Sequence, residues 1–104
     1  MTRRVEYSDL ARVDLAKIWD HLADRVSIRG ADSAVQSIEE TLRRTLLRYP
    51  STGRARPELG SGIRSFPIVP YLVFYRVEQR RIYIERVLHG HRDIRQPLMS
   101  LLVA

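Results

Sequence analysis

The sequence predicts an α+β fold of element order β-α-α-β-β-β, with two helices on one side of a mostly antiparallel sheet. In the first half, apolar residues recur three and four positions apart in two consecutive segments, which predicts two amphipathic helices. After Gly62 the apolar pattern changes to that of extended strands. We expect residues 1–104 to form a single domain, because this length suits one core and no linker, repeat or low-complexity tract interrupts it.

The chain is expected to begin with a short strand followed by a helix. The segment Arg3–Tyr7 has the composition of a strand. Ser8 is the expected N-cap of a helix that runs to about Arg25, and Asp9 and Asp14 fall near the positive end of its dipole. The apolar stripe of this helix is Leu10, Ala11, Leu15, Ile18, Trp19 and Leu22.

A second helix is expected from about Ala31 to Arg48, after a break at Arg29 and Gly30. Two amphipathic helices joined by a short break predict an antiparallel helical hairpin. Pro50 ends the second helix. Its apolar stripe is Ala31, Ala34, Val35, Ile38, Leu42 and Leu46.

Three strands are expected after a loop that covers residues 51–62, which contain three glycines and a proline. The strands are residues 63–69, 71–77 and 81–88. The middle strand is nearly continuous in apolar residues, which indicates that both of its faces are covered. The apolar tail at residues 93–104 has the composition of a short helix.

Arg86 interrupts the pattern of the last strand. Strict alternation places its side chain on the same face as Ile82 and Ile84. Either a β-bulge intervenes, or this face becomes a functional surface towards its end.

The positive charge of the chain is unevenly distributed. The formal net charge is +6, of which residues 1–49 carry +1 and residues 50–104 carry +5. All but one of the 18 basic residues are arginine, whose planar guanidinium group makes paired contacts with carboxylate or phosphate. A GC-rich genome and a solvated surface explain the total number of arginines equally well. They explain less readily why the excess of positive charge lies in the second half of the chain. An anionic partner is therefore expected at the second half.

The composition excludes several classes of protein. Without cysteine there is no disulfide framework, thiolate zinc site or cysteine nucleophile, and we expect neither a metal nor a cofactor. The apolar runs are much shorter than a bilayer requires, and residues 1–4 do not lead into a signal-peptide core. We expect a cytoplasmic protein that does not associate with a membrane.

Short motifs extend over nearly the whole chain. The first helix carries Ala11, Asp14, Leu15, Ile18 and Trp19. The later motifs are Pro50-x-x-Gly53-Arg54, Glu58-Leu59, Gly62-Ile-Arg64, Tyr71-Leu-Val-Phe-Tyr-Arg76 and Val87-Leu-His-Gly-His-Arg-Asp93. In this order and spacing they resemble the RelE/ParE toxin superfamily of bacterial toxin–antitoxin modules, and the ParE branch more closely.

The resemblance implies a RelE/ParE-like fold and a growth-inhibiting toxin. Its expected partner is a small cognate antitoxin whose acidic, disordered segment neutralises it in a toxin–antitoxin hetero-oligomer. ParE-type members poison DNA gyrase, whereas RelE-type members cleave messenger RNA on the ribosome, and a shared fold does not decide between them. We expect a ParE-like toxin that acts on gyrase. The alternatives are a ribosome-dependent mRNA endonuclease and a non-toxic binding module.

The endonuclease alternative requires a general base, cations beside the phosphate and a general acid. The candidates are Glu58 as base, Arg64 and Arg76 as phosphate clamps, and His89 or His91 as acid. Each also has a structural interpretation, as a solvated charge, a partner-binding group or a capping residue. Against the endonuclease, no aromatic residue follows the last strand.

A gyrase poison needs no catalytic group, because the DNA break is made by gyrase. It needs a basic face and an exposed, partly apolar contact surface. The leucines of the tail have an alternative role, which is to pack back over the sheet. The expected antitoxin-binding or target-binding residues are Arg64, Arg76, Arg86, Arg92, Arg95, Leu98 and Leu101.

Overall fold

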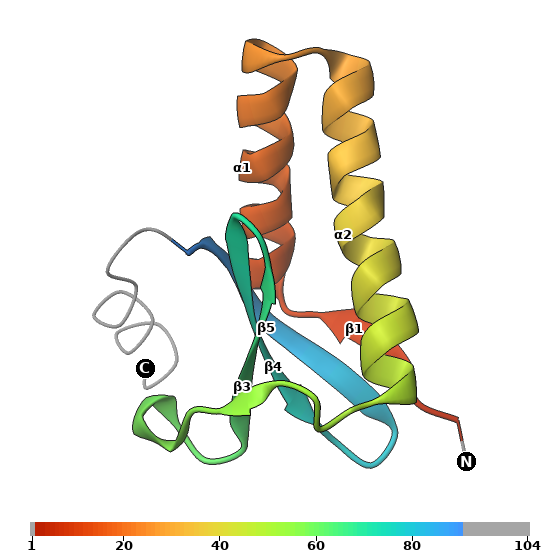
Figure 1. Cartoon of the computed structure of the whole chain (residues 1–104), viewed down its shortest axis with the longest axis vertical. Coiled ribbons are helices and arrows are strands. Elements are labelled where there is room, and N and C mark those ends of the chain that lie inside the picture. Colours follow the sequence, from red (N-terminus) through yellow and green to blue (C-terminus); the bar gives the residue numbers. More distant parts are fainter. Residues whose placement is uncertain (1, 91–104) are drawn as a thin grey trace.

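The computed structural model describes residues 2–90, which form two α-helices, a short 3₁₀ helix and a five-stranded sheet (Figure 1). The elements are β1 (Arg4–Tyr7), α1 (Asp9–Arg25), α2 (Ile28–Arg48), β2 (Arg54–Ala55), η1 (Pro57–Leu59), β3 (Ile63–Ile68), β4 (Tyr71–Val77) and β5 (Arg81–His89). The strand order is β1-β5-β4-β3-β2. β1 runs parallel to β5, and the other neighbouring strands are antiparallel. The α+β fold class is therefore confirmed.

The two helices form the expected antiparallel hairpin, which packs on β1 and β5 and projects beyond the sheet (Figure 1). Ser8 caps α1 as predicted, because its Oγ accepts a hydrogen bond from the Ala11 N–H at 2.9 Å. No helix within residues 2–90 is both long and apolar enough to cross a membrane.

The start of α2 differs from the prediction. The expected break at Arg29 and Gly30 is wrong, because both residues lie in the first turn of α2. Ser27 is the N-cap, and its Oγ accepts a hydrogen bond from the Gly30 N–H at 2.9 Å. A capping serine starts a helix without a glycine break, and the glycine at the third helical position is tolerated.

The segment predicted as a loop contains two short elements. β2 pairs with β3, and the Arg56 N–H donates to the Ile63 carbonyl at 2.8 Å. η1 then turns the chain so that Leu59 is buried. Both elements depend on contacts with β3 and β4, so the glycine-rich composition of residues 51–62 does not reveal them.

Apolar side chains form a cluster on each face of the sheet. The cluster between the helices and the sheet contains Ala11, Leu15, Ile38, Leu42, Leu46, Val73, Tyr75, Ile82, Ile84 and Val87. On the other face, Leu59 covers Ile63 and Phe74, with Leu72 and Leu88 packed at the margin. β4 is thus covered on both faces, as its nearly continuous apolar sequence predicts.

A β-bulge interrupts β5, which was one of the two alternatives that Arg86 left open. Phe74 lies opposite Arg86 and Tyr75 lies opposite Ile84, so Glu85 has no opposite residue in β4. Ser8 fixes this bulge, because its hydroxyl donates to the Glu85 carbonyl at 2.7 Å. The cap of α1 and the bulge in β5 are therefore joined by one side chain.

Candidate functional site

Arg64 and His89, two members of the candidate catalytic set, lie in β3 and β5, opposite different residues of β4. Arg64 is opposite Tyr75, and His89 is opposite Tyr71. These two tyrosines are four residues apart on one strand, a backbone distance of about 13 Å. The structure therefore does not bring Arg64 and His89 to one phosphate group.

Arg64 and Tyr75 together hold the segment that follows α2. Arg64 Nη1 donates to the Gly53 carbonyl at 2.7 Å and to the Ser51 carbonyl at 3.3 Å. Tyr75 Oη accepts from the Gly53 N–H and donates to the Pro50 carbonyl, both at 2.8 Å. A Cβ atom on Gly53 would lie 2.5 Å from Tyr75 Oη, so this close approach requires glycine. Here Arg64 has a structural role.

Arg76 lies on the sheet face that η1 covers, Glu58 lies in η1 itself, and each pairs within the chain. Arg76 Nε contacts Glu85 Oε2 at 2.6 Å, and its Nη1 donates to the Ser61 carbonyl at 2.6 Å. Arg56 Nε contacts Glu58 Oε2 at 2.7 Å. The two candidate groups for RNA cleavage therefore have carboxylate and guanidinium partners of their own.

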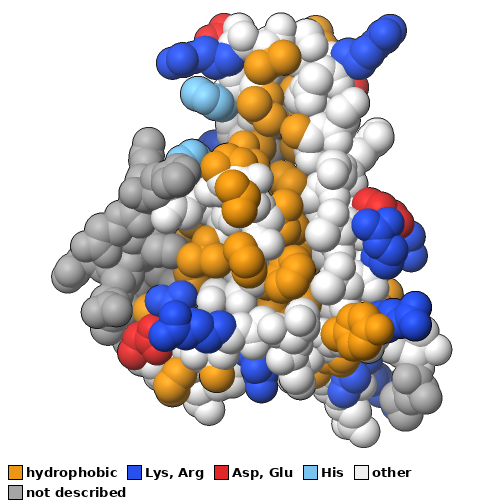
Figure 2. All heavy atoms as spheres, in the orientation of Figure 1, with side chains coloured by type: hydrophobic (Ala, Val, Ile, Leu, Met, Phe, Trp, Pro, Cys, Tyr) orange, Lys and Arg blue, Asp and Glu red, His pale blue; other side chains and the backbone are white. Residues whose placement is uncertain are grey.

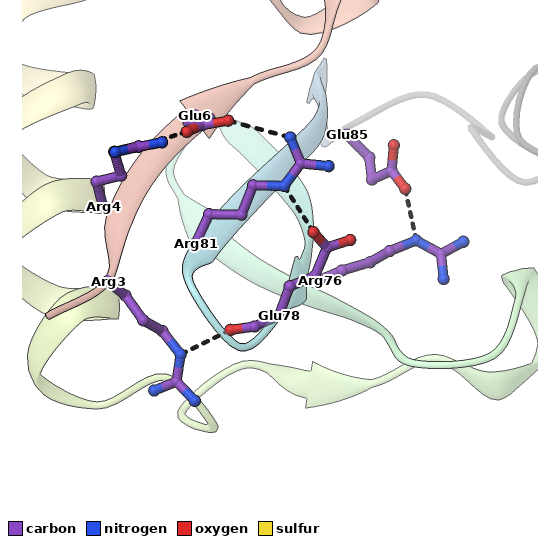
Figure 3. A network of polar contacts seen from close by, with 7 residues as sticks. All are labelled: Arg3, Arg4, Glu6, Arg76, Glu78, Arg81 and Glu85. Atoms are coloured by element: carbon purple, nitrogen blue, oxygen red, sulfur yellow. Dashed lines mark hydrogen bonds and ion pairs between the residues drawn. The ribbon is translucent and has the colours of Figure 1, made fainter. Parts of the chain in front are cut away.

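The same sheet face carries a network of alternating charges (Figure 3). Arg81 bridges Glu78 at 2.6 Å and Glu6 at 3.0 Å, and Arg4 contacts the other oxygen of Glu6 at 2.6 Å. Hydrogen bonds from Arg4 and then from Arg81 hold the pKa of the Glu6 carboxyl below its usual value. The Arg81 guanidinium also lies 4.0 Å from the centre of the Tyr83 ring. Carboxylates of the chain itself therefore compensate much of the arginine charge on this face.

Arg86 is buried between β5 and α1. Its Nε and Nη2 each donate to a different oxygen of Asp14 at 2.8 Å, and the Val87 N–H donates to Asp14 Oδ2 at 2.9 Å. The side chains of Arg86 and Asp14 are 9% and 6% exposed. Arg86 is thus absent from the accessible surface, and Asp14 is an ion-pair partner in the core rather than a charge at the helix dipole.

The chain matches a family of known proteins. Residues 5–94 match the family model described as the ParE toxin of the type II toxin–antitoxin system, parDE. The chain belongs to the ParE toxin family. It is the toxin component of a type II toxin–antitoxin system, as the sequence motifs led us to expect.

Curated and solved relatives agree with this assignment. Toxin ParE3 of Caulobacter vibrioides is 28% identical over 81 residues, 78% of this chain and 80% of that toxin. Toxin ParE1 of the same organism is 30% identical over 88 residues, 85% of this chain and 90% of that toxin. The chromosomal ParDE toxin–antitoxin system of P. aeruginosa has a TM-score of 0.67 at 27% identity, and the match covers 86% of this chain and 95% of that one.

A second solved relative belongs to the RelE side of the superfamily. The toxin–antitoxin complex RelBE2 of Mycobacterium tuberculosis has a TM-score of 0.61 at 27% identity, with 86% of this chain and 92% of that chain covered. ParE and RelE proteins thus share the fold of this chain. The arrangement of side chains has to distinguish a ParE activity from a RelE activity.

The ParE-family toxin exposes apolar side chains that the sequence analysis did not place at the surface. In Figure 2 hydrophobic side chains run from the helical hairpin down over the sheet. We call Leu10, Val13, Val26 and Ile28 the hairpin apolar residues; they are 39%, 47%, 69% and 64% exposed. Leu10 was expected in the buried stripe. Val13 and Val26 fall outside that stripe, and this mismatch is the signal that could have identified them.

The remaining candidates lie outside the described residues, namely His91, Arg92, Arg95, Leu98 and Leu101. Within residues 2–90, no group of three or more His, Cys, Asp or Glu side chains is arranged to hold a metal ion. Of the candidate arginines that the structure describes, Arg76 is therefore the accessible one without a structural role, and the hairpin apolar residues add an exposed apolar surface.

Proposed function

We propose that this ParE-family toxin arrests growth by binding DNA gyrase while gyrase holds cleaved DNA. The supporting observation is the separation of Arg64 and His89 along β4, because an RNA-cleaving site needs its cation and its acid at one phosphate. A gyrase poison needs only a binding surface, since gyrase itself breaks the DNA. The two proposed partners, gyrase and an antitoxin, place the toxin in the cytoplasm.

We propose that a cognate antitoxin neutralises this toxin by wrapping an acidic segment around it. The ParDE and RelBE2 relatives are toxin–antitoxin assemblies, which supports such a partner. The hairpin apolar residues offer contact area for apolar anchors. Arg76, one third exposed, can exchange its contact with Glu85 for a carboxylate of the antitoxin.

We expect the adjacent reading frame to encode a small protein with an acidic segment, and the antitoxin proposal is tested with that protein. We expect it to form a complex with the toxin in titration calorimetry. Val13→Glu and Ile28→Glu should each weaken this complex at least about tenfold, because a charge would be buried against an apolar anchor. Ser33→Glu, at an exposed position of α2, is the matched control and should bind normally. If all three variants bind the antitoxin as tightly as the natural chain does, the hairpin apolar residues are not part of the antitoxin contact.

The gyrase proposal is tested by inducing the toxin without its antitoxin in growing cells. We expect growth arrest together with gyrase-linked DNA breaks, while messenger RNA on translating ribosomes remains intact. Cleaved messenger RNA without DNA breaks would support the endonuclease instead. Normal growth would indicate the non-toxic binding module.

A further inference from the structure

Ion pairs leave the two ends of this toxin with different charges. Within residues 2–90, every acidic side chain outside α1 and α2 is in an ion pair, namely Glu6, Glu58, Glu78 and Glu85. The acidic side chains outside these pairs lie in the helices, where basic ones such as Arg25 and Arg29 accompany them. At the other end of the molecule, five arginines are in none of the ion pairs within residues 2–90: Arg3, Arg48, Arg54, Arg64 and Arg80. We call these five arginines the basic end.

Contacts between the elements place the five arginines at one end of the molecule. Arg3 Nε donates to the Glu78 carbonyl at 2.7 Å, which joins the start of β1 to the turn between β4 and β5. Tyr75 and Arg64 hold the segment between α2 and β2 against β4 and β3. The last turn of α2, β2 and the β4–β5 turn therefore lie at the same end, opposite the tip of the helical hairpin (Figure 1). Figure 2 shows Lys and Arg side chains along this lower end.

The basic end keeps an excess of positive charge. Arg3 and Arg64 donate to backbone carbonyls, which carry no net charge, and the other three arginines are exposed. Residues 91–104 contain one acidic residue, Asp93, against Arg92 and Arg95, so their side chains add no negative charge on balance. The basic end therefore attracts an anionic partner.

The surroundings of the basic end favour a nucleic acid over a protein. A protein interface has an apolar centre, whereas a protein–DNA interface is more polar and much more positively charged. Among the large apolar side chains exposed within residues 2–90, Tyr49 alone lies at this end, and the others lie in the hairpin and the β3–β4 turn. The Arg48 guanidinium lies 5.6 Å from the centre of the Tyr49 ring. Guanidinium groups and tyrosine hydroxyls both donate hydrogen bonds to phosphate oxygens.

We propose that the basic end binds the phosphate backbone of double-stranded DNA. This inference rests on the proposed function for the source of the DNA, which is the duplex that gyrase holds. The contact does not depend on base sequence, because the phosphates are alike along each strand. The hairpin apolar residues are not part of it, so the toxin presents one surface to DNA and another to the antitoxin.

The experiment measures fluorescence anisotropy of a labelled duplex of about 20 base pairs while antitoxin-free toxin is added, without gyrase. We expect a Kd of about 1–100 µM at physiological salt, and weaker binding as the salt concentration rises. A triple variant with Arg48→Gln, Arg54→Gln and Arg80→Gln should bind at least about tenfold more weakly. Its slope of log K against log salt should be shallower by about 3, since three phosphate contacts are lost.

The matched control removes the same charge from exposed positions of the hairpin, through Arg12→Gln, Arg25→Gln and Arg29→Gln. This variant should bind the duplex like the natural chain. Equal losses in the two triple variants would overturn the proposal, because net charge alone would then attract the DNA. Polyglutamate that displaces the duplex as well as unlabelled DNA does, or tighter binding of an RNA duplex of the same sequence, would also overturn it.

Failure of this inference can be distinguished from failure of the gyrase proposal. If the toxin traps cleaved DNA on gyrase but the basic-end variant binds the duplex normally, the inference alone is wrong. If the basic end binds the duplex but the toxin leaves gyrase unaffected, the inference is supported and the gyrase proposal is wrong.

Discussion

At the residue scale, the contact between Asp14 and Arg86 joins α1 to β5 through charges, in addition to the apolar core between them. Asp14 accepts three hydrogen bonds, two from Arg86 and one from the Val87 backbone. Asp14→Ala would leave the buried guanidinium without its carboxylate. We expect a loss of about 3–5 kcal/mol in the free energy of unfolding, measured in urea.

The control for this ion pair is the double variant Asp14→Leu with Arg86→Met. Replacing both charges by apolar groups of similar size should recover much of the stability, because no uncompensated charge remains. A single Asp14→Ala variant as stable as the natural chain would show that the buried pair does not hold the helix.

Tyr75 holds the backbone of Pro50 and Gly53, in the segment that follows α2. Tyr75→Phe would remove both hydrogen bonds at its hydroxyl and leave the buried Gly53 N–H without a partner. We expect a loss of about 1–3 kcal/mol in the free energy of unfolding. Tyr49→Phe is the matched control, since that ring is 57% exposed, and it should unfold like the natural chain. Equal stability of the two variants would refute this role.

The two candidate arginines are expected to affect antitoxin binding by different routes. Arg64→Ala would release the carbonyls of Ser51 and Gly53, whereas Arg76→Ala would remove an exposed contact for a carboxylate. We expect both variants to bind antitoxin more weakly, and Arg76→Ala to lose most at low salt, where ion pairs count most. Titration calorimetry at two salt concentrations measures this, and unchanged affinities would contradict it.

At the scale of elements, Tyr7 links β1 to α2 and makes their contact sensitive to pH. Burial, with a smaller effect of Glu39, raises the pKa of the Tyr7 hydroxyl from 10.0 to about 12. The folded chain therefore keeps this proton at a pH at which the unfolded chain loses it. The contribution of Tyr7 to the free energy of unfolding is therefore complete below pH 10, and it is lost as the pH rises from 10 towards 12.

The test of the Tyr7 contribution is a series of urea unfolding curves across this pH range. Tyr7→Phe has no hydroxyl to titrate, so its stability should fall less steeply above pH 10 than that of the natural chain. The same slope for both proteins would assign the loss to other groups.

The helices and strands were predictable where local signals determine them. Ser8 caps α1 as its sequence context indicates, and the broken alternation at Arg86 offered a β-bulge as one of two alternatives, of which the structure shows the bulge. The start of α2 was misjudged because Gly30 was taken as a break when Ser27 already supplies the cap. β2 and η1 were missed, since their hydrogen bonds and buried side chains depend on β3 and β4.

At the scale of the whole molecule, the sequence gives the number of charged residues, but it does not show which acidic and basic side chains form ion pairs. Glu6 belongs to the nearly neutral first half, yet it contacts Arg81 of the basic second half across β1 and β5. Likewise Arg64 and His89 have suitable chemistry for RNA cleavage, but strand register separates them. The motifs in the sequence were therefore enough to predict the family. The fold was needed to find which candidate side chains are exposed to solvent.

We propose that this ParE-family toxin binds gyrase and does not cut RNA. The most direct measurement incubates antitoxin-free toxin with purified gyrase and supercoiled DNA, and quantifies DNA that is covalently attached to gyrase. We expect cleaved complexes to accumulate with toxin and to disappear when the antitoxin is added. Unchanged gyrase activity, together with cleavage of messenger RNA on translating ribosomes, would contradict it.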